Sequence, residues 1–318
     1  MPTYNKIISR ESVGEQLMPT EVITEVLQAA PEASVVLTRA RKARMSTKKQ
    51  KQPVLATLPD AYWVDGDTGL KQTSDATWKG VTMTAEELAV IVPIPDAVVD
   101  DSEINLWEVV KPLIAEAIGK KIDQAVLFGV DKPDSWPEDI LTGAKTAGNA
   151  VKVTAKKNVG DAAIELGEKL ATQGYGVNAF ASRPGLEWHL RGLKDNEGRP
   201  IYGAPMSEAQ PSTLFGFPLD PVKNGAWDAS KAELAAIDWS RVIVGIRQDI
   251  TYEMFREGVI SDSSGKVVLN LMQQDAKAMR VVMRLGYQVA NPPTRLAAGE
   301  QQFPAGIVEP AAAAGVGG

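Results

Sequence analysis

The chain has 318 residues and a mass of 34.1 kDa, a length that suits about two domains. It has no cysteine and one histidine, His189, which excludes disulfides, thiolate metal sites, cysteine nucleophiles and metal sites with two histidine ligands. The net charge of −6 disfavours a strongly basic nucleic-acid-binding domain, although it leaves room for a local basic patch.

The N-terminal part predicts an arm with one short helix. Residues 1–19 have weak periodicity and lack the apolar region of a secretory signal, so we expect a protein that acts where it is made or leaves by cell lysis. Residues 21–29 place four aliphatic side chains on one face, which predicts an amphipathic helix. Because so short a helix is unstable alone, we expect it to dock on another surface.

A basic stretch follows the arm. It contains no acidic residue, and its cations are Arg39, Arg41, Lys42, Arg44, Lys48, Lys49 and Lys51. Cations this close repel one another unless something neutralises them. Two interpretations stay open: a solvated or salt-bridged strand edge, and a contact with nucleic acid.

Residues 52–95 predict a long two-stranded hairpin. Tyr62-Trp63-Val64 lead into a polar turn at residues 65–69, and Trp78 begins a return strand that continues to Ile94. The middle is too polar to form a core of its own. A projection that nevertheless carries tryptophans is expected to pack on a partner.

The strongest predicted helix runs from Asp100 to Gly129. Asp100 and Glu103 have the spacing of a capping box, which explains the acidic pair Asp100-Asp101 better than paired catalytic carboxylates do. Pro112 should kink or split the helix. An apolar stripe recurs every three or four residues, at Ile104, Trp107, Val110, Ile114, Ile118, Ile122 and Val126.

The rest of the chain alternates short helices and strands. We predict helices at residues 159–172 and 184–193, the first closed by Gly174, and a turn at residues 195–200. Strands are predicted at residues 177–182, 214–219, 241–246, 250–255, 267–272 and 279–289. From Gly299 the chain is of low complexity and is expected to be mobile.

Sequence motifs of catalysis are missing. There is no glycine-rich phosphate-binding loop, and Gly174-Tyr175-Gly176 is better explained as a helix stop. His189 has neither a nucleophile elbow nor a metal motif around it, so we expect a half-buried or surface residue. We therefore predict no catalytic, cofactor-binding or metal-binding residues.

The order of elements and four short motifs carry a family resemblance. The motifs are Ala61-Tyr62-Trp63-Val64-Asp65-Gly66-Asp67, Leu88 to Pro95 followed by Asp100-Asp101-Ser102, Ala117-Ile118-Gly119 through Asp123 to Gly129, and Leu214-Phe215-Gly216-Phe217-Pro218-Leu219. Over residues 18–297 the chain resembles the major capsid proteins of tailed bacteriophages with the Hong Kong 97-type fold.

The resemblance implies an α+β fold with defined regions. These would be an N-terminal arm (1–45), an extended loop or E-loop (46–85), a peripheral or P domain with a spine helix (86–152 and 247–297), an axial or A domain (153–246) and a flexible tail (298–318). Copies of the chain would assemble through pentamers and hexamers into an icosahedral head around double-stranded DNA. Only about 18 residues precede the Pro19-Thr20 start, so any scaffolding protein would be separate.

The resemblance also implies partners and a location. These are other copies of the chain, a portal, a decoration protein in some cases and packaged DNA, but no membrane. The protein would be made in the bacterial cytoplasm and end in the virion. In such a shell, we favour acidic patches of neighbouring subunits over DNA as the partner of the stretch from Arg39 to Lys51.

Some members of this family crosslink a lysine of the E-loop to an asparagine with the help of a buried glutamate. Here the lysine could be Lys71 or Lys79, and the carboxamide could be Asn270, Gln273 or Gln274. Residues 276–291 contain no acid, only Arg280 and Arg284, which leaves Asp275 as a substitute. Because a proton acceptor is needed, we predict no self-crosslinking.

Three alternatives remain. A bacterial nanocompartment shell of the same fold, like an encapsulin, would enclose cargo enzymes. An enzyme based on Asp, Glu and Lys chemistry is disfavoured by the missing motifs. A soluble nucleic-acid-binding protein built on Arg39 to Lys51 is disfavoured by the net charge.

Overall fold

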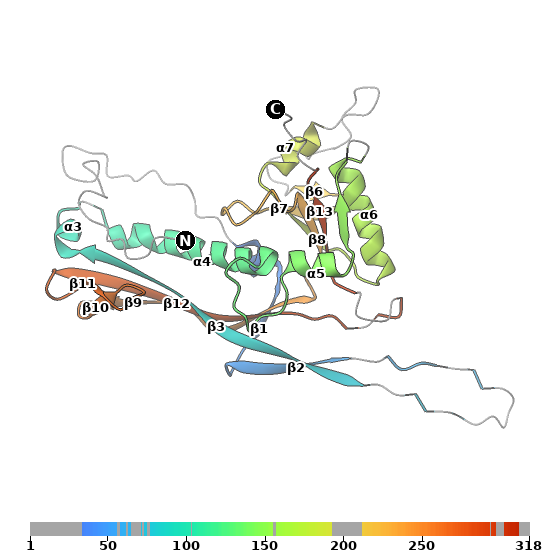
Figure 1. The fold of residues 1–318 in the computed structure, drawn as a ribbon, viewed down its shortest axis with the longest axis horizontal. Helices are drawn as coiled ribbons and strands as arrows, with labels where there is room; N and C mark the ends of the chain where they lie inside the picture. Colours follow the sequence, from blue (N-terminus) through green and yellow to red (C-terminus); the bar gives the residue numbers. More distant parts are fainter. Residues whose placement is uncertain are drawn as a thin grey trace. The chain divides into compact units, whose positions relative to one another are not determined.

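A computed structural model gives the structure of most of the chain (Figure 1). It describes residues 34–55, 58–61, 63–64, 71, 73–74, 77–102, 104–154, 157–192, 212–292, 294–296 and 302–311. The helix predicted at residues 21–29 and the turn at residues 195–200 lie outside these ranges.

The chain divides into two compact units. The first contains residues 86–118 and 248–285, and the second contains the described residues of 33–85, 119–247 and 286–318. Four long elements belong to both units: β3 (Trp78–Pro95), α4 (Leu106–Phe128), β9 (Val242–Phe255) and β12 (Ala276–Val289).

Helix α4 confirms the strongest sequence prediction. Ile114, Ile118, Ile122 and Val126 are all buried, and Gly129 ends the helix with a φ of 66°. Pro112 lies inside α4 without splitting it, so the split was wrong, and a kink at this residue stays a prediction. Burial of the apolar face outweighs the cost of about 3 kcal/mol for a proline in a helix interior.

The predicted capping box was also wrong. Residues Asp96–Asp100 form a separate short helix, α3, of which Asp100 is the last residue and Asp101 the C-cap. Val98 of α3 packs with Ile94 and Leu106 in a small buried cluster. Helix α4 begins only at Leu106.

A five-stranded sheet has the strand order β1-β9-β12-β3-β2. Strand β1 (Arg41–Arg44) pairs in parallel with β9, and β2 (Lys49–Leu55) pairs antiparallel with β3. The two strands predicted at residues 241–246 and 250–255 are one continuous strand, β9, because residues 247–249 include no glycine or proline and continue the alternation of exposure. Strands β10 (Val259–Ser261) and β11 (Val267–Asn270) form a separate hairpin.

A six-stranded sheet forms the core of the second unit. Its order is β4 (Ala150–Lys152), β13 (Ala305–Glu309), β8 (Leu234–Ile237), β5 (Ala179–Ser182), β7 (Phe217–Pro221) and β6 (Thr213–Leu214). Helix α6 (Val159–Thr172) packs Leu166 and Leu170 into this core, and α7 (Leu186–Arg191) adds Leu186 and Leu190. Helix α5 (Ile140–Thr146) contacts β13.

Strand β13 corrects the prediction of a mobile C-terminal tail. It pairs in parallel with β4 and antiparallel with β8, and Ile307 and Val308 are fully buried. A Cβ at Gly306 would meet the Leu166 side chain and would lie 2.9 Å from the carbonyl oxygen of Asn149, so only glycine fits there. The strand has five residues between Pro304 and Pro310, and these prolines with the following alanines hide it from a composition-based reading.

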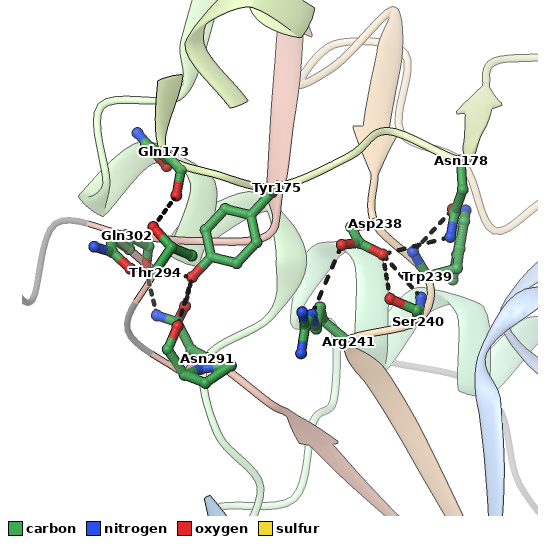
Figure 2. A network of polar contacts seen from close by, with 11 residues as sticks. Gln173, Tyr175, Asn178, Asp238, Trp239, Ser240, Arg241, Asn291, Thr294 and Gln302 are labelled. Carbon is green, nitrogen blue, oxygen red and sulfur yellow. Dashed lines mark hydrogen bonds and ion pairs between the residues drawn. The ribbon is translucent and has the colours of Figure 1, made fainter. Parts of the chain in front are cut away.

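Polar contacts fasten the segment that leads into β13 (Figure 2). The Asn149 side-chain amide donates to the carbonyl oxygens of Phe303 at 3.1 Å and Ala305 at 3.2 Å. Tyr175 donates to Asn291, whose amide in turn donates to the carbonyl oxygen of Gln302. Burial raises the pKa of Tyr175 to about 12, which keeps the hydroxyl a donor at neutral pH.

The predicted apolar strand at residues 214–219 is a tight hairpin. Strands β6 and β7 are joined by Phe215 and Gly216, whose φ angles are 53° and 84°. Two-residue turns with positive φ at both positions favour Asn-Gly, because a bulky side chain is strained in the left-handed region. Phe215 is 53% exposed, so burial does little to offset this strain.

We expect Phe215→Asn to stabilise the isolated subunit. Removing the backbone strain should raise its free energy of unfolding by about 1 kcal/mol, measured by chemical denaturation. Phe217→Asn is the matched control. Phe217 packs edge-on against Phe180, so its replacement should lower the free energy of unfolding of the subunit. A lower stability for Phe215→Asn would contradict the strain argument.

Candidate functional site

The hairpin of β2 and β3 changes character along its length. At its base, Met83 and Ala85 are buried with Met45 and Ile243 in a small core. Further out, Trp78 is 69% exposed and Trp63 is 100% exposed. The described part of the hairpin beyond Met83 therefore has no core of its own, which confirms that part of the sequence interpretation; residues 65–70 lie outside the described ranges.

The basic stretch separates into two kinds of cation. Arg39 forms a two-point ion pair with Asp220, at 2.7 and 2.8 Å, and this hydrogen bonding raises the pKa of Arg39. Five other cations are exposed and have no ion pair with any described residue; we call them the basic strip, and they are Arg41, Lys42, Arg44, Lys49 and Lys51. The salt-bridged interpretation is thus confirmed for Arg39, and within the described ranges no ion pair extends it to the strip.

A buried carboxylate anchors the chain just before this stretch. Asp123 of α4 is fully buried and accepts hydrogen bonds from the Ser34 hydroxyl (2.6 Å), the Val35 and Val36 amides (3.2 and 3.1 Å) and the Asn224 side chain (2.7 Å). Burial raises the pKa of Asp123, and the four donors oppose that effect. Asp123 thereby caps the start of α2 (Val35–Arg39), a role that the sequence did not indicate because the partners lie 89 and 101 residues away.

The residues considered for crosslinking are either exposed or hydrogen-bonded to one another. Lys71 and Lys79 are exposed. The side-chain amide of Asn270 donates to the side-chain oxygen of Gln273 at 3.0 Å. The backbone amide of Asn270 donates to the side-chain oxygen of Gln274, also at 3.0 Å. Asp275 is exposed, so no buried carboxylate stands in this turn.

Two carboxylates that sequence reasoning missed lie beside Arg280 and Arg284. Glu253 of β9 pairs with Arg280, and Glu87 of β3 pairs with Arg284. Neighbouring strands supply them, so no local signal could have found them. Both glutamates are about half exposed, 51% and 47%, and both are paired with an arginine, so neither is the buried carboxylate that the crosslinking chemistry calls for.

The remaining candidates for chemistry are His189 and the acidic side chains of the described ranges. His189 is exposed on α7. Within the described ranges, no group of three or more acidic or histidine side chains could hold a metal ion. In the same ranges, no helix is long and apolar enough to cross a membrane.

Comparison with known proteins identifies the family. The profile of the phage capsid family matches residues 14–294. The chain belongs to the phage capsid family. This capsid protein is 29% identical over 290 residues to the major capsid protein of Staphylococcus phage 80alpha. The matched region covers 90% of this chain and 86% of that protein. It is 23% identical over 287 residues to the major capsid protein of Enterobacteria phage HK97, covering 87% and 70% of the two chains.

Solved structures agree with the family. The capsid protein matches a chain from Microbacterium phage Oxtober96 with a TM-score of 0.82 and 32% identity, covering 96% of this chain and 100% of that one. A chain from Mycobacterium phage Adephagia matches with a TM-score of 0.81 and 34% identity, covering 96% and 99%. The predicted α+β class and Hong Kong 97-type capsid fold are confirmed, and the protein is a major capsid protein of the virion shell.

Proposed function

We propose that the capsid protein assembles through pentamers and hexamers into an icosahedral head that encloses double-stranded DNA, and that its role is structural and not enzymatic. The observation that carries this proposal is the hairpin with exposed Trp63 and Trp78, in a chain of the phage capsid family. Large exposed apolar side chains on a projection suit burial by a neighbouring copy.

We assign roles to the regions on the same basis. Residues 1–45 serve as the N-terminal arm, 46–85 as the E-loop, 86–152 and 247–297 as the P domain, and 153–246 as the A domain. Strand β4 is moved from the P domain to the A domain, and β13 is added to the A domain, because both strands pair within its sheet. Synthesis takes place in the host cytoplasm, and portal, scaffolding and decoration proteins are the further partners.

Assembly of the purified protein tests the proposal. Size-exclusion chromatography and negative-stain microscopy, with and without the phage's scaffolding protein, should show capsomers or closed shells. A strictly monomeric protein at high concentration in both conditions would refute the proposal. Shells isolated from infected cells should contain DNA, whereas enclosed enzymes would identify a nanocompartment.

The hairpin should matter for assembly and not for folding. We expect Trp63→Ser to change the free energy of unfolding by less than about 0.5 kcal/mol, because the side chain is fully exposed. Shell yield should fall by about tenfold or more, because an interfacial tryptophan is usually worth more than ~1.4 kcal/mol.

A buried tryptophan provides the contrast for this experiment. Trp136 is 7% exposed, donates to the Thr84 carbonyl oxygen at 3.2 Å and packs against Tyr287. Trp136→Ser should therefore lower the free energy of unfolding of the subunit strongly. If Trp63→Ser destabilises the subunit as Trp136→Ser does, the hairpin belongs to the folding core.

Mature particles should also contain no covalent crosslinks. After boiling in SDS, they should give one band near 34.1 kDa, because none of the described carboxylates near Asn270 is a buried proton acceptor. A ladder of multimers that survives boiling would show crosslinking. Glu253→Gln and Glu87→Gln would then identify which glutamate accepts the proton.

A further inference from the structure

We propose that the basic strip of one subunit binds the acidic segment around the α3–α4 junction of a second copy of this chain. This inference rests on the proposed function, since it names the two surfaces through which copies meet. The acidic segment is defined here as residues 96–102 and 104–108.

The basic strip presents exposed cations to a partner surface. Arg41, Lys42 and Arg44 lie on β1, at an edge of the five-stranded sheet, and Lys49 and Lys51 lie on β2 at the opposite edge. All five are exposed and have no ion pair within the described parts of the chain. Arg41, Lys42 and Arg44 lie within four residues of one strand and repel one another, and an anionic surface opposite them relieves that repulsion.

The acidic segment is the complementary surface. Residues 86–118 contain eight acidic residues and one lysine, whereas residues 34–55 contain seven basic residues and no acid. Asp100 and Asp101 are exposed at the C-terminal end of α3, where the helix carbonyl groups already carry partial negative charge. Asp96 and Glu108 have local partners, Lys277 and Lys111, but Asp100 has no ion pair with a described residue.

The two surfaces are different, and every copy carries both. A contact between unlike surfaces is heterologous, and it closes into rings when the rotation between neighbours allows it. Such a contact suits a capsomer. Packaged DNA is the weaker candidate for the strip because the chain as a whole has a net charge of −6.

A charge swap tests the contact. The first variant carries Arg41→Glu, Lys42→Glu and Arg44→Glu; the second carries Asp100→Lys and Asp101→Lys; the third carries all five changes. The control carries Lys152→Glu, Lys223→Glu and Lys266→Glu. These lysines are also exposed, and their replacement changes the net charge by the same amount as the first variant does. Assembly is measured without nucleic acid, by light scattering and microscopy, after thermal unfolding shows that each variant is folded.

The first and second variants should each lose about tenfold or more in shell yield, because placing like charges opposite one another opposes association. The third variant, which carries all five changes, should recover most of the yield, and the control should assemble normally. A normal yield of empty shells from the first variant, in the absence of nucleic acid, would overturn the inference in favour of nucleic acid as the partner of the strip. Failure of the swap to restore assembly would overturn the pairing. If the unmodified protein itself does not assemble, the proposed function fails instead.

Discussion

Replacing Asp123 with alanine should lower the free energy of unfolding of the subunit by about 3–5 kcal/mol, measured by urea denaturation. The carboxylate accepts four hydrogen bonds in a fully buried position. Alanine would leave the Ser34 hydroxyl, two backbone amides and the Asn224 side chain without an acceptor and without access to water. Each unsatisfied buried donor costs about 1–3 kcal/mol, less whatever the site relaxes.

Two variants make this prediction specific. Asp123→Asn keeps the shape of the side chain but turns an NH2 group toward two donors, so we expect a loss close to that of alanine. Asp134→Ala removes an exposed aspartate with no described partner and should change stability by less than about 0.5 kcal/mol. A loss below about 1 kcal/mol for Asp123→Ala would show that water or movement satisfies the donors.

Truncation before β13 should abolish cooperative folding of the second unit. Removing residues 304–318 takes the strand between β4 and β8 out of the sheet, which leaves β4 without a partner strand and β8 paired only with β5. Circular dichroism should show a non-cooperative thermal transition, and the protein should aggregate through the open strand edges. Removing residues 312–318 alone is the control and should have little effect on the transition.

A milder substitution keeps this test decisive if the truncated protein is insoluble. Ile307 is 1% exposed, and Ile307→Ala should destabilise the subunit by about 2–5 kcal/mol through the lost contacts and the cavity left behind. A near-neutral effect would mean that β13 packs loosely and that the mobile-tail interpretation was closer to the truth.

Local periodicity explains what the sequence predicted well. The apolar stripe of α4 recurs at helical spacing, and α6 begins at Val159 and ends at Thr172, as its pattern indicated. The hairpin was recognised because turn residues separate two apolar runs. Each of these signals lies within about 30 residues of sequence, where side-chain spacing reports directly on secondary structure.

What the sequence did not reveal depends on partners far along the chain. Asp123 has no local sign of its contact with Ser34 and Asn224, and Glu87 lies 197 residues from Arg284. Strand β13 is too short for periodicity to stand out among prolines and alanines. The Phe215 turn was missed because its backbone breaks the preference that sequence rules rely on.

The position of β13 also has a kinetic consequence. Ile307 pairs with Ala150 on one side and with Ala235 on the other, so both pairings of β13 join segments that are distant in sequence. Such non-local pairing forms slowly, because a long loop must close before any contact rewards it. Until it forms, β4 and β8 remain open edges on which other chains can add. Folding of the subunit therefore competes with aggregation most strongly when newly made copies are most concentrated, which is also when shells are built.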